Sequence, residues 1–318
     1  MNTFVWVLCL GAIVATNIVA QTLSPFDALR STESARSAGL AGAFVAFPGD
    51  VTAQIYNPAT LPTVEPHTLS LTFTKHVLDI NSGVATYATR LRSGYAGAYA
   101  AVTSYGTFTR TDGLGNALGS FSAGSVALAV SYANQFDTNA YYGVTIGYVQ
   151  TTIDRVAASA LVANVGILYQ LPHIRTTIGA SFRYLGIQLA RMNGQDASLP
   201  TDVRVGISHR LRGLPLLVNL NLTRLAEDRM TLGERLRNFT LGGELYLGKA
   251  LQVRIGYDNA IRVSQSSATA SFLTGMGVGV GIVFPEFTLD YTLTIMSTPA
   301  IVHRVSCGLA LERLFANP

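Results

Sequence analysis

The histidines and the glycine-rich turns are the first places to look for catalytic or metal-binding chemistry. The histidines are widely dispersed, and none falls in an HExxH or another metal-binding spacing; they are His67, His76, His173, His209 and His303. Gly113-Leu114-Gly115 lacks the strand-to-helix setting of a phosphate-binding loop, and no GxSxG precedes a helix. The sequence therefore predicts no catalytic residues, no metal ligands and no cofactor. An enzyme would need Ser, His and Asp side chains that converge only in the fold, and we expect that the protein is not an enzyme.

Charged residues placed between apolar ones offer a different chemistry, the formation of buried ion pairs. They are Arg183, Arg204, Glu244, Arg254, Asp290 and Arg304. Glu33, Arg36 and Asp50 precede residue 68 and carry charges that can pair with them, and Asn57 lies in a turn of the same segment. Because a charge removed from water is costly unless it is paired, we expect contacts between the two sets.

The elements that hold these charges read as β-strands. From about residue 68 the dominant period is two, as in Leu251, Val253, Ile255 and Tyr257. A soluble β-sandwich also alternates, but its exterior usually carries Lys and Glu, and this chain has only Lys75 and Lys249. In a membrane barrel the apolar face meets lipid, and the polar face lines the lumen. The pattern therefore favours a membrane barrel.

The connections between strands give an independent test. About fourteen strands follow residue 68, an even number that single-chain barrels allow. Short links are expected near 91–94, 172–175, 212–215, 248–249 and 285–286. Longer links are expected near 105–121, 186–201, 225–237 and 258–273. Short periplasmic turns alternating with long external loops are typical of outer-membrane barrels, so the sequence predicts an all-β, single transmembrane antiparallel barrel over residues 68–315.

Aromatic residues toward the strand ends are expected on the lipid-facing side, in the interfacial girdles. They are Tyr169, Tyr184, Phe239, Tyr257 and Phe287. The ordinary preference of aromatic residues for strands is the alternative explanation. The predicted lumen face, by contrast, is polar, charged and rich in glycine.

Composition agrees with a membrane protein, since hydrophobic residues make up 49% and charged residues 13% of the 318-residue chain, against about 25% charged in soluble proteins. The apolar run from Phe4 to Ala15, with Ala20 before Gln21, predicts a cleaved signal peptide over 1–20. An N-terminal membrane anchor is the alternative. Cys9 would leave with the signal, and Cys307 alone builds no disulfide framework. The net charge of +4 rests on scattered arginines, so we expect no nucleic-acid partner.

Residues 21–67 do not alternate and are rich in small residues. About 45 residues are too few for a stable core of their own, so we expect this segment to form a plug inside the lumen. A loose periplasmic leader is the alternative.

Two stretches resemble a known family. Ala38-Gly39-Leu40-Ala41-Gly42-Ala43 and Tyr56-Asn57-Pro58-Ala59 resemble the N-terminal region of the PorV/PorQ group, which is related in fold to the FadL-type fatty-acid channels. The resemblance to the PorQ family is sharper, and it rests on Gly106-Thr107-Phe108-Thr109-Arg110-Thr111-Asp112, Gly115-Asn116, Gly119-Ser120-Phe121-Ser122-Ala123-Gly124, Leu199-Pro200, Gly206-Ile207-Ser208, Arg210-Leu211 and Pro215. It extends over nearly the whole chain after the predicted signal peptide.

The resemblance implies an outer-membrane component of the type IX protein secretion system. Such a component would lie among outer-membrane lipids and anchor a PorZ-like surface protein of the attachment complex, alongside the sortase PorU and the shuttle PorV. Arg110, Asp112 and Asn116 lie in a predicted external loop and are candidate docking residues; a loop shaped only by its glycines is the alternative. A FadL-like channel for hydrophobic solutes and a passive pore are the other functions left open. The polar lumen face predicted here favours a plugged structural barrel.

Overall fold

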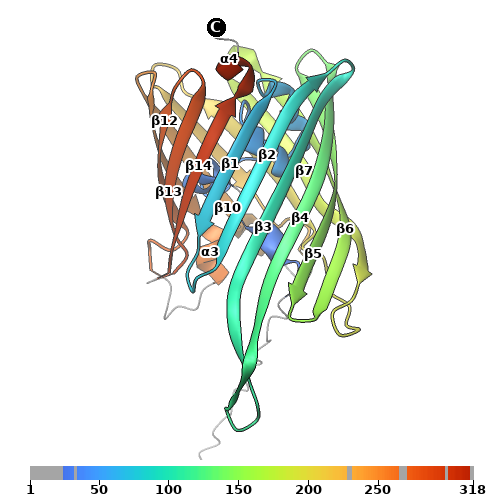
Figure 1. The fold of residues 1–318 in the computed structure, drawn as a ribbon. Helices are drawn as coiled ribbons and strands as arrows, with labels where there is room; N and C mark the ends of the chain where they lie inside the picture. The colour runs from blue at the N-terminus through green and yellow to red at the C-terminus, as the bar shows by residue number, and fades with distance from the viewer. Residues whose placement is uncertain (1–23, 32–33, 228–230, 265–270, 298–299, 316–318) are drawn as a thin grey trace, which may run out of the picture.

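Fourteen antiparallel strands close into a barrel in the computed structural model, which describes residues 24–31, 34–227, 231–264, 271–297 and 300–315 (Figure 1). Each strand pairs with its neighbour in sequence, and β1 pairs with β14 from Thr68↔Ala310 to Lys75↔His303. Because the sheet closes on itself, no strand edge is left unpaired in lipid, where each orphaned backbone group would cost several kcal/mol. The predicted fourteen-stranded barrel is confirmed. The strands are β1 Thr68–Lys75, β2 Asn81–Leu91, β3 Gly94–Thr111, β4 Ala117–Asp137, β5 Ala140–Ile153, β6 Val156–Leu171, β7 Thr176–Ala190, β8 Asp202–Arg210, β9 Leu216–Leu222, β10 Phe239–Leu247, β11 Leu251–Asp258, β12 Met276–Val283, β13 Phe287–Ile295 and β14 Ile301–Ala310.

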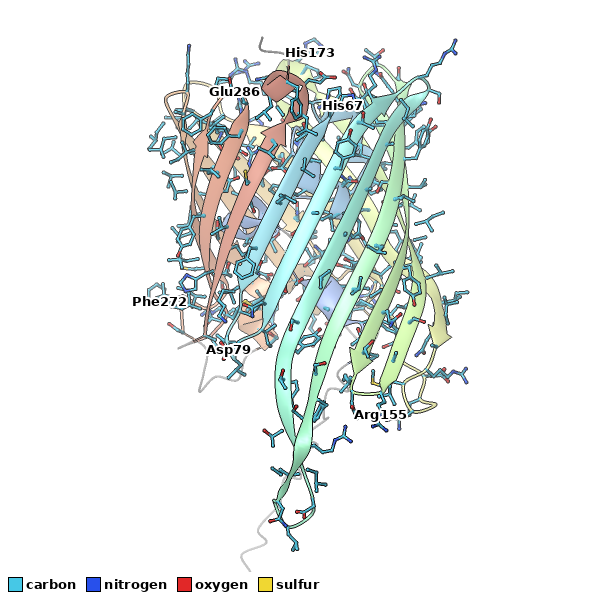
Figure 2. The ribbon with its side chains drawn as sticks, viewed as in Figure 1. His67, Asp79, Arg155, His173, Phe272 and Glu286 are labelled. Atoms are coloured by element: carbon cyan, nitrogen blue, oxygen red, sulfur yellow. The ribbon has the colours of Figure 1, made fainter. Side chains whose placement is uncertain are left out.

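The barrel is apolar outside and largely polar inside, the reverse of a soluble protein. In β1, Phe73 is 55% exposed while its neighbour Thr72 is 6% exposed. The same alternation continues around the wall, with leucine, isoleucine and valine side chains pointing outward (Figure 2). An exposed apolar band is stable only where lipid covers it, so the barrel is embedded in a membrane. In the part of the chain that the structure describes, no helix has the length and apolar character needed to cross a membrane.

The two ends of the barrel differ in their connections. All five predicted short links join strands at the end where His67, His173 and Glu286 lie, which we call the short-turn end (Figure 2). The opposite end, where Asp79, Arg155 and Phe272 lie, is the long-loop end. Its links range from two residues between β5 and β6 to the seventeen positions between β11 and β12, which include α3 (Asn259–Ser264). The β3–β4 hairpin projects from this end well beyond the other strands (Figure 1).

Residues 24–64, as far as they are described, lie inside the barrel, and we call them the lumen segment (Figure 1). The segment forms short helices, η1 Asp27–Arg30, α1 Ala35–Gly39, η2 Val51–Ile55 and η3 Pro58–Thr63. From Ser34 to Phe47 nearly every residue is buried. Three short helices complete the secondary structure of the described residues, η4 Pro172–Ile174, α2 Leu232–Arg237 and α4 Leu311–Phe315. The predicted signal peptide and Glu33 fall outside the described residues.

Three expectations about the wall are wrong. The long link expected near 105–121 is a turn of five residues, because β3 runs to Thr111 and β4 begins at Ala117, and Arg110 therefore lies at the end of β3. Tyr184 does not lie in a lipid-facing girdle, since it is 2% exposed inside the barrel. The β6–β7 register shifts between Ala163 and Val165, Tyr184 has φ 57°, and its backbone N–H donates to the Asn164 side chain at 2.8 Å. This bulge turns the side chain to the opposite face. The lumen face is also not uniformly polar, because its β2–β6 part is largely apolar.

Candidate functional site

A network of five charged side chains joins the lumen segment to the wall. Arg36 of α1 pairs with Asp50 at 3.2 Å and with Glu244 of β10 at 2.9 Å. Glu244 also pairs at 3.1 Å with Arg254 of β11, which in turn pairs with Asp290 of β13. We call these residues the charge network. Five of the predicted lumen contacts therefore meet in one place, Arg36 and Asp50 from the lumen segment and three from the wall.

The charge network is removed from water. Glu244 and Arg254 are 0% and 1% exposed. Burial opposes the charged form of Arg36, but Glu244 and Asp50 outweigh it and raise the pKa of its guanidinium. Arg36 also lies 4.7 Å from the centre of the Phe47 ring. α1 packs against β11–β14. Because a buried charge that loses its partner is strongly destabilising, the network also ties α1 to β10.

Hydrogen bonds and glycines bring α1 close enough to the wall for these pairs. Ser34 caps α1 in a reciprocal capping box with Ser37. The backbone N–H of Ala35 donates to Ser306 at 2.8 Å, and Thr292 donates to the Ala35 carbonyl at 2.7 Å. A Cβ added at Gly242 would lie 2.9 Å from the Cβ of Leu40, the residue that follows α1, so only glycine lets the end of this helix approach β10 this closely.

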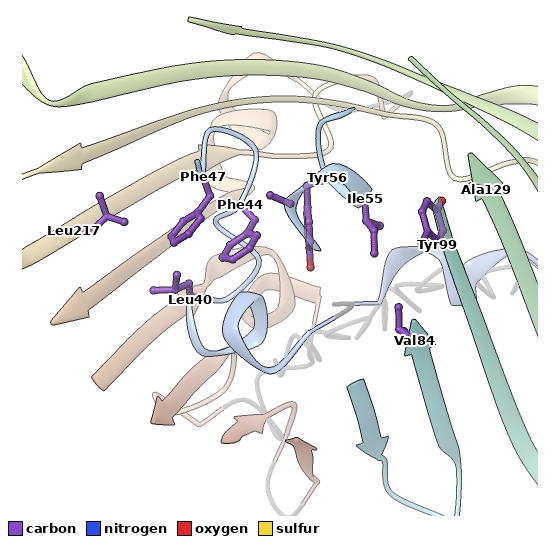
Figure 3. Packing of buried hydrophobic residues seen from close by; sticks show 10 residues of the cluster. Leu40, Phe44, Phe47, Ile55, Tyr56, Val84, Tyr99, Ala129 and Leu217 are labelled. Carbon is purple, nitrogen blue, oxygen red and sulfur yellow. The ribbon is translucent and has the colours of Figure 1, made fainter. Parts of the chain in front are cut away.

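A second cluster surrounds Tyr56 of the lumen segment. The guanidinium of Arg183 lies 5.3 Å from the centre of the Tyr56 ring, and that of Arg204 lies 6.0 Å from it. Arg204 pairs with Asp202, a partner that the sequence analysis missed. Figure 3 shows Tyr56 beside Phe44 and Phe47. The rings of Phe44 and Phe47 stack with their centres 4.2 Å apart. Sequence spacing gave no signal for this cluster, because Arg183 and Tyr56 are far apart along the chain.

The remaining predicted lumen residues lie elsewhere. Asn57 caps η3 and donates to the carbonyls of Val45 at 2.8 Å and Ile167 at 3.0 Å, which ties the lumen segment to β6. Arg304 is buried on β14 and donates to Thr294 at 3.1 Å, outside the charge network.

The candidate docking residues at the tip of the β3–β4 hairpin are held by local bonds. Asp112 accepts hydrogen bonds from the side-chain and backbone N–H groups of Asn116, both at 2.8 Å, and these bonds lower the pKa of Asp112. Arg110 pairs with Asp154 in the β5–β6 turn. Its guanidinium lies 5.9 Å from the centre of the Phe121 ring. These contacts account for the shape of the hairpin tip without a partner. A docking role for these residues therefore stays a proposal.

The wall opposite the charge network carries an apolar strip. It consists of lumen-facing residues of β2–β6: Val84, Tyr99, Ala101, Ala127, Ala129, Val149, Ala158, Ala160 and Val162. Val84, Ala101, Ala127, Val149 and Ala160 form one continuous row, since each lies opposite the next across the strands. Phe26 and Leu29 of the lumen segment cover this strip and are themselves buried. Between η1 and the strip lies a cavity of about 20 Å³.

The arrangement can be compared with known proteins. No protein-family model matches the chain, and no curated protein matches it in sequence. Among solved structures, the CymD monoaromatic hydrocarbon channel has a TM-score of 0.61 at 14% identity, over 87% of this chain and 97% of that one. The Pseudomonas putida toluene transporter TodX has a TM-score of 0.60 at 14% identity, over 88% and 98%. The chain has the fold of these channel barrels. In the described residues, no group of three His, Cys, Asp or Glu side chains is arranged to hold a metal ion.

Proposed function

We propose that this protein is a channel of the bacterial outer membrane that passes small hydrophobic solutes along the apolar strip. The strip is the observation that carries the proposal, because alanine and valine side chains on a lumen wall offer a polar solute no hydrogen-bonding partner. The fold shared with a monoaromatic hydrocarbon channel and a toluene transporter supports the same function.

The lumen segment itself suggests the size of the solute. The benzyl side chain of Phe26 is 0% exposed and packs among Ala127, Val149, Ala158 and Ala160. A monoaromatic ring is therefore accommodated by the strip. Transfer of a toluene-sized molecule from water to such a wall is favourable by about 0.8 kcal/mol for each CH₂ group buried. A cavity of about 20 Å³ has room for about one water, so passage requires Phe26 and Leu29 to give way.

Uptake of labelled toluene by cells that produce the protein tests the proposal. We expect faster uptake than in cells carrying the empty vector. Ala160→Asp places a charge on the strip, and because a charge in apolar surroundings is costly, uptake should fall to the vector level. Thr240→Asp adds the same charge to a buried, lumen-facing position of β10 outside the strip and should leave uptake intact.

Phe26→Ala gives a second test that does not burden the barrel with a charge. Because this substitution removes the ring that occupies part of the expected solute path, uptake should rise. All variants are first checked for a folded barrel by heat-modifiability on gels. Uptake at the vector level by the unmodified protein would exclude the channel. Equal effects of Ala160→Asp and Thr240→Asp would exclude the strip as the path.

A second candidate function is a scaffold of the type IX secretion system, as the PorQ resemblance implies. The observation that favours it is the β3–β4 hairpin, which extends beyond the barrel with Leu114 90% and Leu118 62% exposed (Figure 1). Exposed apolar residues outside a membrane are typical of a surface that meets another protein. The partner would be a PorZ-like surface protein, with PorU and PorV in the same complex.

Pull-down of the tagged protein from its native cells separates the two functions. If the scaffold is correct, type IX components are recovered, and replacing residues 110–116 with a short turn abolishes their recovery. Toluene uptake should then be unchanged by the replacement. Recovery of no type IX component, or retention that survives the replacement, would contradict docking at the hairpin.

A further inference from the structure

A pocket of about 400 Å³ lies at the short-turn end, between the lumen segment and the ends of β7–β10. Its buried floor includes Phe47 and Leu217, while Thr177 and Ser208 supply hydroxyl groups. These wall residues face the lumen, so the pocket is separate from the lipid-facing surface. It also lies at the other end of the barrel from the cavity beside η1.

Three arginines line this pocket, and no Asp or Glu does: Arg36, Arg175 and Arg210. Arg36 is already paired with Asp50 and Glu244 in the charge network. Within the described part of the chain, neither Arg175 nor Arg210 has a carboxylate within ion-pair distance. The pocket therefore holds two positive charges that the protein does not neutralise with an acidic partner.

The two arginines are fixed as neighbours. The backbone N–H of Arg210 donates to the carbonyl of Arg175 at 3.0 Å. The guanidinium of Arg210 lies 4.6 Å from the centre of the Tyr246 ring. A cation held over the face of an aromatic ring keeps the N–H groups in its plane available, and that planar fork matches the oxygens of a carboxylate or phosphate. Arg210 also forms a side-chain hydrogen bond with Tyr246. Tyr246 thus fixes the orientation of Arg210, and a guanidinium has five N–H donors, which leaves others for an anion.

We propose that this pocket binds a small organic anion, one with a carboxylate or phosphate group for Arg175 and Arg210 and an apolar part for Phe47 and Leu217. Its volume lies within the range of about 300–1,000 Å³ found for small-molecule sites. Since the short turns of outer-membrane barrels face the periplasm, the anion would come from that side. Neither proposed function uses this pocket.

Binding of phenyl phosphate and of benzoate to the purified full-length protein, measured by calorimetry in detergent, tests the proposal. At least one of the two anions should bind, and neutral benzyl alcohol should bind far more weakly. In the double variant Arg175→Gln with Arg210→Gln, the anion's affinity should fall by about tenfold or more, because the charged hydrogen bonds of both guanidinium groups are lost. Arg175 and Arg210 are exposed, so the barrel should remain heat-modifiable.

Arg212→Gln is the matched control, since Arg212 lies in the β8–β9 turn at the same end but does not line the pocket. It should leave the affinity unchanged. An equal loss in this control would show attraction by overall charge alone and overturn the site. So would undiminished binding in the double variant, equal binding of benzyl alcohol, or no binding of either anion. Toluene uptake does not depend on these arginines, so failure here would not count against the channel.

Discussion

At the scale of single residues, Glu244 occupies a special position because one carboxylate serves two arginines. Arg36 comes from the lumen segment and Arg254 from the wall, and Glu244 has no exposed surface. Replacing the pair with apolar residues is often tolerated in proteins, whereas removing one partner leaves a buried charge uncompensated. The stability of this region therefore depends on the carboxylate being present.

We predict that Glu244→Gln destabilises the folded protein by about 3–5 kcal/mol. Glu65→Gln is the control, because Glu65 pairs with Arg313 on the exposed short-turn surface, where an ion pair contributes about 0–1 kcal/mol. Denaturant unfolding in lipid vesicles, followed by circular dichroism, measures both. Similar losses in the two variants would show that the charge network contributes no more than a surface pair.

At the scale of elements, glycines decide how closely the lumen segment approaches the wall. Gly242 and Gly243 are adjacent in β10 but face opposite sides. A Cβ at Gly242 would lie 2.9 Å from Leu40, whereas one at Gly243 would make contacts of 3.8 Å with neighbouring strand side chains. The two positions thus form a matched pair for a test of this contact.

We predict that Gly242→Val pushes α1 away from the wall, with an overpacking cost of about 1–3 kcal/mol, while Gly243→Val leaves α1 in place. The measurement is labelling of Ala38→Cys by a water-soluble thiol reagent in a Cys307→Ser background. Ala38 is 1% exposed, so labelling should be slow in the parent and in Gly243→Val. It should become fast in Gly242→Val; unchanged protection there would mean that the close approach is dispensable.

The same scale shows what the sequence could predict. Alternation determined which residues share a face, and turn residues located the short links, so strand number and order were predictable. Tyr184 was misplaced because one bulge reverses the alternation and leaves no mark in the pattern. The network around Glu244 could be predicted only as a set of charges, since its pair with Arg36 joins residues 208 positions apart. Alternation also does not show which strands form the polar part of the lumen wall and which strands form the apolar part.

At the scale of the whole molecule, the two walls of the lumen contact the lumen segment through different kinds of interaction. The β10–β13 wall holds α1 through charges, while the β2–β6 wall meets Phe26 and Leu29 mainly through apolar contacts, beside one hydrogen bond from Thr151 to the Pro25 carbonyl. Apolar contacts are non-directional and can be exchanged for those of a solute, whereas buried ion pairs have no such substitute. The part of the lumen segment around Phe26 and Leu29 is therefore the part that a solute can displace most easily, as the proposed channel requires.

If the lumen segment is what closes the barrel, its removal should open a pore. Barrels of eight strands are filled by their own side chains, and those of sixteen to eighteen leave an aqueous channel; fourteen strands here enclose the lumen segment as well. We predict that deleting residues 24–64 gives a barrel with stepwise ionic conductance in planar bilayers, where the intact protein gives none. Replacing residues 110–116 is the control, because it shortens a hairpin outside the lumen and should not conduct. A deletion variant that remains heat-modifiable but does not conduct would show that the wall side chains or the loops of the long-loop end close the barrel instead.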